Sequence, residues 1–227
     1  MKKICALLLL TLPALPTFAK ESDVDHRLDE ATTTLREIMN AGDKSIPEDL
    51  LRKAHCIVVV PGLKKGAFIV GGKYGKGFVS CRAKGLPGWS SPAAIRVEGG
   101  SVGFQIGGSE TDVVMLVMNE RGSEKLLQSK FTLGGEGEVA AGPVGRNASA
   151  QTDAKMTAEI LSWSRSRGVF AGVSLQGATL RPDTDDNQAL YGEKIGTREV
   201  VSRKSAPPAA ATGLIALLDR YSPMEKH

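Results

Sequence analysis

The spacing of hydrophobic residues predicts two helices after the first twenty residues. Between positions 21 and 40, apolar side chains recur every three or four residues, which predicts a helix with one buried face. The apolar stripe consists of Val24, Leu28, Ala31, Leu35 and Ile38. Acidic residues occupy the opposite face, namely Asp23, Asp25, Asp29, Glu30 and Glu37. A short second helix is predicted around Pro47, which suits a first turn, with Ser45 and Glu48 at the spacing of a capping box.

The following segment has the pattern of β-strands. A continuous run of mostly β-branched residues at 56–60 predicts a buried strand, which we expect to end at Pro61-Gly62. Strands are also predicted at 67–73 and 76–82. Because the dipeptide Tyr74-Gly75 lies between them, these two strands are predicted to form a tight hairpin.

The rest of the chain continues this mixture of strands and helices. A second hairpin turn is predicted at Gly99-Gly100, between strands at 94–97 and 101–106. Further strands are predicted at 111–118, 136–141, 150–157, 160–164 and 169–176. Further helices are predicted at 122–130, 183–191 and 209–221. The order of elements predicts an α+β domain with an antiparallel, barrel-like or sandwiched β-sheet flanked by N- and C-terminal helices.

The first residues have the layout of a bacterial secretory signal peptide. Lys2 and Lys3 precede a short apolar run, and small residues end the segment at Ala19. We therefore expect a signal peptide at 1–19, cleaved near Ala19, and a single domain at 20–227 that is exported to the periplasm or secreted. An uncleaved N-terminal anchor is the alternative. Cys5 lies within the signal, so two cysteines remain, Cys56 and Cys81, and an exported protein with this pair permits one disulfide.

Charge is distributed unevenly along the chain. No acidic residue occurs from Leu50 to Val97, a stretch that contains nine lysines and arginines. Such a segment attracts anions. Six of its basic residues lie at or near the predicted turns and strand ends: Lys64, Lys65, Lys73, Lys76, Arg82 and Lys84. If the hairpins share one sheet, several of these side chains meet at one rim and form a site for lipid head groups. The alternative is a set of solvated lysines at turn tips.

The sequence contains no recognisable catalytic, cofactor or metal-binding arrangement. His55 is the only histidine placed for a Ser-His-Asp device, and no G-x-S-x-G motif accompanies it. The glycine-rich segment 71–77 lacks the spacing of a nucleotide-binding P-loop. The acidic segment 183–187 lacks the glycine and glutamate of an EF-hand calcium loop, so it is interpreted as a helix N-terminus. We expect no enzyme activity, no cofactor and no metal.

Several separated segments resemble the SYLF domain family. They are AHCIVVVPGLKKGAFIVGGKYGKGF at 54–78, GWSSP at 88–92, GFQIGG at 103–108, SRSRGVFAG at 164–172 and YG at 191–192. The resemblance extends from about Ala31 to Tyr221. It implies a lipid-binding domain, since eukaryotic SYLF proteins bind phosphoinositides and yeast members also bind and bundle actin. It places head-group contacts on the lysines of the first segment, Lys64, Lys65, Lys73 and Lys76.

These observations lead to three functional hypotheses. The first is a non-catalytic protein of the bacterial envelope that binds anionic phospholipid or a membrane surface. The second is a structural or protein-interaction module with an envelope protein as its partner. The third, a hydrolase, is disfavoured by the scarcity of histidine. Nucleic acid is not an expected partner, because an exported protein with few aromatic residues offers little for base stacking.

Overall fold

The computed structural model describes residues 22–68, 70–82, 88–102, 107–142, 158–166, 169–170 and 174–223. The expected signal peptide, the candidate residue Lys84 and the strand predicted at 150–157 lie outside these residues. Within them, no helix is both long enough and apolar enough to cross a bilayer.

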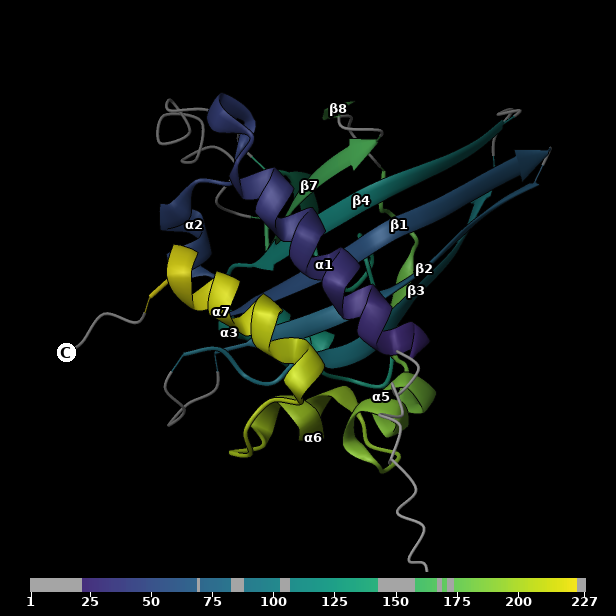
Figure 1. The fold of residues 1–227 in the computed structure, drawn as a ribbon. Coiled ribbons are helices and arrows are strands. Elements are labelled where there is room, and N and C mark those ends of the chain that lie inside the picture. The colour runs from purple at the N-terminus through teal and green to yellow at the C-terminus, as the bar shows by residue number, and fades with distance from the viewer. Residues whose placement is uncertain are drawn as a thin grey trace, which may run out of the picture.

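A curled nine-stranded sheet forms the centre of the fold (Figure 1). Its four long strands are β1 (Cys56–Phe68), β2 (Val70–Cys81), β3 (Ala93–Val102) and β4 (Gly107–Val117). The shorter strands are β5 (Phe131–Thr132), β6 (Val139–Ala141), β7 (Ile160–Ser166), β8 (Val169–Phe170) and β9 (Thr179–Pro182). The strand order is β5-β9-β3-β2-β1-β4-β7-β6, with β8 paired to β7. All pairs are antiparallel except β6–β7.

The two ends of this sheet come close together. Leu133, directly after β5, is bridged to Gly137, two residues before β6. Because β5 and β6 are the two edge strands of the order, this short turn curls the sheet back on itself as a partly open barrel. The barrel-like α+β fold expected from the sequence is therefore confirmed.

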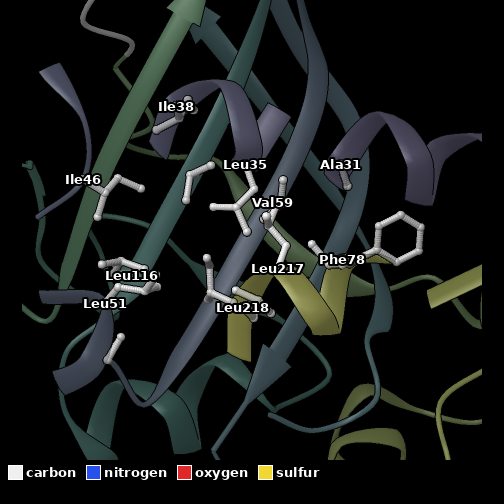
Figure 2. Close-up of a cluster of buried hydrophobic side chains, with 14 of the residues drawn as sticks. Ala31, Leu35, Ile38, Ile46, Leu51, Val59, Phe78, Leu116, Leu217 and Leu218 are labelled. Carbon is white, nitrogen blue, oxygen red and sulfur yellow. The ribbon is translucent and has the colours of Figure 1, made fainter. Parts of the chain in front are cut away.

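Three helices cover one face of the sheet, which we call the helix face. They are α1 (Asp23–Met39), α2 (Glu48–Lys53) and α7 (Thr212–Tyr221). Figure 2 shows side chains from these helices meeting side chains of the strands, among them Leu35, Leu51, Val59, Phe78 and Leu218. The apolar stripe predicted for the first helix is buried in this cluster. The far ends of β1 to β4 extend beyond α1 in Figure 1.

The opposite face of the sheet lines the inside of the curl, and we call it the inner face. It buries a second cluster that includes Val58, Val79 and Met115. The remaining helices are α3 (Glu120–Leu126), α5 (Thr184–Tyr191) and α6 (Thr197–Ser202), with short 3-10 turns η1 (Gly42–Lys44) and η2 (Ala209–Ala211). Where β1 and β4 are covered on both faces, their sequences are continuous hydrophobic runs, at 56–60 and 113–117.

Both predicted hairpin turns were placed wrongly. β1 does not end at Pro61-Gly62 but continues to Phe68, with a bulge between Val59 and Lys64 that absorbs this dipeptide. β2 runs straight through Tyr74-Gly75, and β3 runs straight through Gly99-Gly100. Some of the glycines in these strands are required for close packing rather than for turns. A Cβ on Gly77 would lie 2.2 Å from the Val59 carbonyl oxygen, and one on Gly99 would lie 2.9 Å from Ala178 Cα.

The helix N-termini were predicted only in part. α1 begins with a capping box formed by Ser22 and Asp25, which was not predicted. At α2, however, the N-cap is Pro47, which makes no side-chain capping bond, so the capping box predicted from Ser45 and Glu48 is wrong. Asp183 caps α5 by accepting a hydrogen bond from the backbone N–H of Asp186, as the acidic segment suggested.

A disulfide joins Cys56, at the start of β1, to Cys81, at the end of β2. Both residues are buried and face each other in register. Cross-linking positions 25 residues apart restricts the unfolded chain, which is worth about 3 kcal/mol of stability in the chain-entropy account.

Replacing both cysteines with alanine is therefore expected to lower the free energy of unfolding by about 3 kcal/mol. Urea unfolding monitored by tryptophan fluorescence measures the difference. Reducing agent should destabilise the wild type to a similar extent and leave the double alanine variant unchanged. Free thiols at these two positions in the oxidised, unfolded wild type would contradict the assignment.

Candidate functional site

The candidate cations on β1 point to opposite faces of the sheet. Adjacent residues of a strand project on alternate sides. In register, Lys64 pairs with Tyr74 of β2 and Lys65 pairs with Lys73. The helix face therefore carries Lys64, and the inner face carries Lys65. The expectation that the basic residues share one rim does not hold for these neighbouring lysines.

On the inner face, Lys65 and Lys73 form a pair of cations that has no carboxylate partner in the described part of the chain. Lys73 is only 7% exposed, and its Nζ donates to the carbonyl oxygens of Ser174 at 2.8 Å and Gln176 at 3.3 Å. Lys65 is half-buried and makes no hydrogen bond or ion pair within the described residues. Ser109 of β4 pairs with Lys65 in register, so its hydroxyl lies on the same face.

The pKa shifts of Lys65 and Lys73 are those expected for two neighbouring cations without a nearby carboxylate among the described residues. Burial lowers the pKa of Lys65. Burial, and secondly the charge of Lys65, lowers the pKa of Lys73. No carboxylate counteracts either shift. An anion placed here would therefore be attracted by both ammonium groups, directly by Lys65 and from beneath the 174–177 loop by Lys73.

Lys76 instead belongs to an internal ion-pair network. Its Nζ lies 2.8 Å from Asp183 and 3.0 Å from Asp186, and Arg27 of α1 also binds Asp186. Burial by itself would lower the pKa of Lys76, but the hydrogen bonds to both aspartates outweigh this effect and raise it. The network ties α1, β2 and α5 together, and it explains the acidic segment that resembled a calcium loop.

Arg82 is also engaged inside the protein. Its guanidinium donates to the carbonyl oxygen of Ser222 at 2.8 Å, contacts the hydroxyl of the same residue, and stacks 4.4 Å from the ring centroid of Trp89. Burial lowers its pKa, against the opposing charge of Asp219. The contacts hold the C-terminal end of α7 to the end of β2, so Arg82 has a structural role here.

A groove of about 1390 Å³ runs between α1 and the helix face of the sheet. Its floor is a cross-strand row formed by Tyr74, Lys64 and Glu110. Tyr74 is 49% exposed and is the only large hydrophobic side chain exposed to this degree among the described residues. Lys64 is exposed and forms no ion pair or hydrogen bond with any described residue. Floor side chains are therefore available to a ligand.

Ion pairs close the groove at both ends. One end holds the network of Arg27, Lys76 and Asp186. At the other end, Arg165 of β7 binds Glu37 of α1 and lies 3.1 Å from Asp112 of β4. Burial would lower the pKa of Arg165, but its hydrogen bonds to these two carboxylates raise it. These clusters fix α1 against the sheet and so set the shape of the groove.

Beyond the groove floor, the helix face continues as bare backbone. Gly72, Gly66 and Gly108 lie in register across three strands, and Gly100 extends the row to β3. All four are exposed, and no atom lies closer than 3.8 Å to a Cβ placed on any of them. Packing within the chain does not require glycine at these positions. A ligand in the groove can therefore approach the sheet closely on this side.

Sequence reasoning selected some groove and inner-face residues and missed others. The predicted site included Lys64, Lys65, Lys73 and Lys76, but it lacked other residues that line the groove or pair with these lysines. The missed residues are Asp29, Tyr74, Ser109, Glu110 and Arg165. Strand alternation through 62–76 would have separated the two faces, but the turn assigned at Tyr74-Gly75 hid it. No group of residues suited to hold a metal ion occurs in the part of the chain that the structure describes.

Several residues that carried the family resemblance are explained by the fold. Trp89 stacks on Arg82, the Tyr191 hydroxyl donates to the Pro92 carbonyl at 2.6 Å, and Gly77 allows β2 to pass the β1 bulge. The resemblance at those residues therefore reflects the structural roles that they have in the fold. They do not by themselves identify a ligand.

Comparison with known proteins identifies the family. Residues 98–221 match the Ysc84 family model, described as "Las17-binding protein actin regulator". The chain is 35% identical to SH3 domain-containing YSC84-like protein 1 of Xenopus laevis over 81% of its length, and 32% identical to the Homo sapiens protein of that name over 88%. The chain is also 32% identical to LAS seventeen-binding protein 3 of Saccharomyces cerevisiae over 78% of its length.

The matched region spans only part of these relatives: 55% of the Xenopus protein, 60% of the human protein and 39% of the yeast protein. Their names and the family description refer to binding and regulation rather than to catalysis. The match extends over more than half of the chain, and it agrees with the SYLF resemblance of the sequence. The chain belongs to the Ysc84/SYLF family.

Proposed function

We propose that this domain is a non-catalytic binding module that docks anionic phospholipid head groups on the inner face of its extended strands. Lys65 makes the direct contact, Ser109 offers a neighbouring hydroxyl, and Lys73 adds positive charge from beneath its loop. The observation that carries the proposal is the cross-strand pair of Lys65 and Lys73, since neither ammonium group has a carboxylate partner among the residues that the structure describes.

The two faces of the extended strands differ in charge, and this difference favours one orientation at a membrane. On the helix face, Glu110 lies opposite Lys64, and α1 adds the exposed carboxylates Asp29 and Glu30. That face would be repelled by an anionic surface. An acidic α1 also disfavours insertion of this helix into a bilayer. The inner face is the side that an anionic surface would attract.

The proposal includes the cell envelope as the site of action. The N-terminal sequence supports export, with cleavage near Ala19, to the periplasm or the outside of the cell. The disulfide between Cys56 and Cys81 is consistent with an oxidising compartment.

Co-sedimentation with vesicles tests the lipid proposal. Phosphatidylcholine vesicles with and without phosphatidylglycerol are compared at low and moderate salt. A basic side chain near an anionic surface contributes about 1 kcal/mol, so Lys65→Glu should weaken binding by about 2 kcal/mol, roughly thirtyfold. Binding should require the anionic lipid and weaken with salt.

Lys64→Glu is the matched control, because it makes the same charge change one residue away on the opposite face. It should weaken binding much less than Lys65→Glu does. Equal binding to neutral and anionic vesicles, or an equal loss in both variants, would reject the inner-face site.

A second candidate function is protein binding. The specific observation that favours it is the description of the matched family, Las17-binding protein actin regulator. For an exported protein the partner would be a protein of the envelope. The groove on the helix face, with its free side chains Tyr74 and Lys64, is the surface suited to this role.

A further inference from the structure

We infer that the groove between α1 and the sheet binds a lysine- or arginine-bearing segment of a partner protein. The inference rests on the second candidate function, protein binding, and it is independent of the lipid proposal. The two proposals use opposite faces of the same strands, so either can fail without the other.

The charge left free in the groove selects a basic ligand. Arg27, Lys76 and Arg165 are each engaged with carboxylates of the protein itself. Of the remaining charged residues that line the groove, three have carboxylates and two, Lys64 and Lys65, have ammonium groups. The Lys65 side chain projects to the inner face, so Lys64 has the ammonium group on the groove side of the sheet. These carboxylates belong to Asp29, Glu30 and Glu110. Glu30 has only a 3.5 Å contact with His26, and no ion pair joins Asp29 or Glu110 to a cation within the described residues.

The shape of the groove suits an extended segment rather than a compact ion. The space of about 1390 Å³ reaches from Arg27 near one end of α1 to Glu37 near the other. α1 forms one wall with Asp29 and Glu30, and the floor presents Glu110 on the opposite side of the space. A peptide lying along α1 would therefore place basic side chains toward carboxylates on both sides.

Tyr74 provides the aromatic contact for such a ligand. Its half-exposed ring lies on the floor beside Lys64, and a cationic side chain bound over the ring face would be attracted by the ring quadrupole. Gly66, Gly72 and Gly108 are exposed and have no side chains that project from the adjoining sheet. The backbone of a ligand can therefore approach the sheet closely beside this ring.

Fluorescence anisotropy with two labelled peptides tests the inference on the intact protein. One peptide alternates lysine with serine, and the other has glutamate in place of each lysine. The basic peptide should bind and the acidic one should not. Tyr74→Ala should weaken binding about two- to fivefold, Glu110→Gln should do so by about two- to fivefold, and the double variant by roughly tenfold.

Two controls separate the groove from general electrostatics. Asp43→Asn removes an exposed acid outside the groove and should leave peptide binding unchanged. Lys65→Glu should weaken vesicle binding roughly thirtyfold without loss of peptide binding. Thermal unfolding checks that each variant folds.

Equal binding of the acidic and basic peptides, or full binding by the double variant, would overturn the inference. Self-association in the absence of peptide that Tyr74→Ala removes would also overturn it, since the groove would then hold a second copy of the chain. Failure of the wild-type protein to bind anionic vesicles, with peptide binding intact, would instead reject the lipid proposal and leave the groove inference standing.

Discussion

Replacing Lys76 with methionine is expected to lower the free energy of unfolding by about 3–5 kcal/mol, since removing one partner leaves a buried carboxylate without its cation. Asp183 is 3% exposed, and its carboxylate lies 2.8 Å from Lys76 Nζ. In the variant, Asp186 still has its ion pair with Arg27, whereas Asp183 loses its ion pair with Lys76. Urea unfolding of the two proteins measures the difference. Lys64→Met, the same substitution at an exposed position, should change stability by less than about 0.5 kcal/mol.

The effect of Lys76→Met should depend on pH. Burial tends to raise the pKa of Asp183, but hydrogen bonds from Lys76 and the Asp186 backbone outweigh it and hold the pKa below its ordinary value of 3.8. This stabilisation is present above pH 3.8 and is lost as pH falls through the folded-state pKa. Because the pKa of Lys76 is raised above its ordinary value of 10.5, its ion pairs stabilise the fold fully below pH 10.5. This stabilisation is lost as pH rises through the folded-state pKa.

The difference between wild type and Lys76→Met should therefore be largest near neutral pH and shrink in acid. Adding Asp183→Asn to the variant removes the unpaired charge and should restore part of the lost stability. A loss of stability that stays constant from neutral to acid pH would contradict the assignment of this network.

Replacing Phe78 with alanine is expected to cost about 3–5 kcal/mol, because it removes a large side chain from a packed core and leaves a cavity. Phe78 is 1% exposed and lies between the sheet and α1, near Ala31 and Val59 (Figure 2). Chemical unfolding of the variant measures the cost. Phe78→Leu keeps most of the volume and should cost less than about 1.5 kcal/mol. Equal losses for alanine and leucine would show that packing volume is not what this position supplies.

Elements with a strong periodic signal were predictable from sequence. The stripe from Val24 to Ile38 has helical spacing, and α1 buries it as expected. The run from Cys56 to Val60 is apolar on both faces and lies in the centre of the sheet. The sequence permits the disulfide but does not determine it, because sequence alone does not fix the strand register that places Cys56 opposite Cys81.

The turns and the candidate site were less predictable, for one common reason. Glycine within a strand looks like a turn residue, although Gly75 and Gly77 are needed where β2 passes Val59, Val60 and Leu63. A turn at Tyr74-Gly75 would place the lysines at loop tips. The continuous strands instead separate Lys64 from Lys65 by face. Only tertiary contacts decide that Lys76 is neutralised by Asp183 and that Lys73 is buried under the 174–177 loop.

The face assignment is tested most directly by lysine acetylation footprinting read by mass spectrometry. The protein is labelled with a limiting amount of acetic anhydride, with and without anionic vesicles, and fragment ions resolve the adjacent residues Lys64 and Lys65. Our account predicts that vesicles slow the acetylation of Lys65 and leave that of Lys64 nearly unchanged. Protection of Lys64 equal to or greater than that of Lys65 would contradict it.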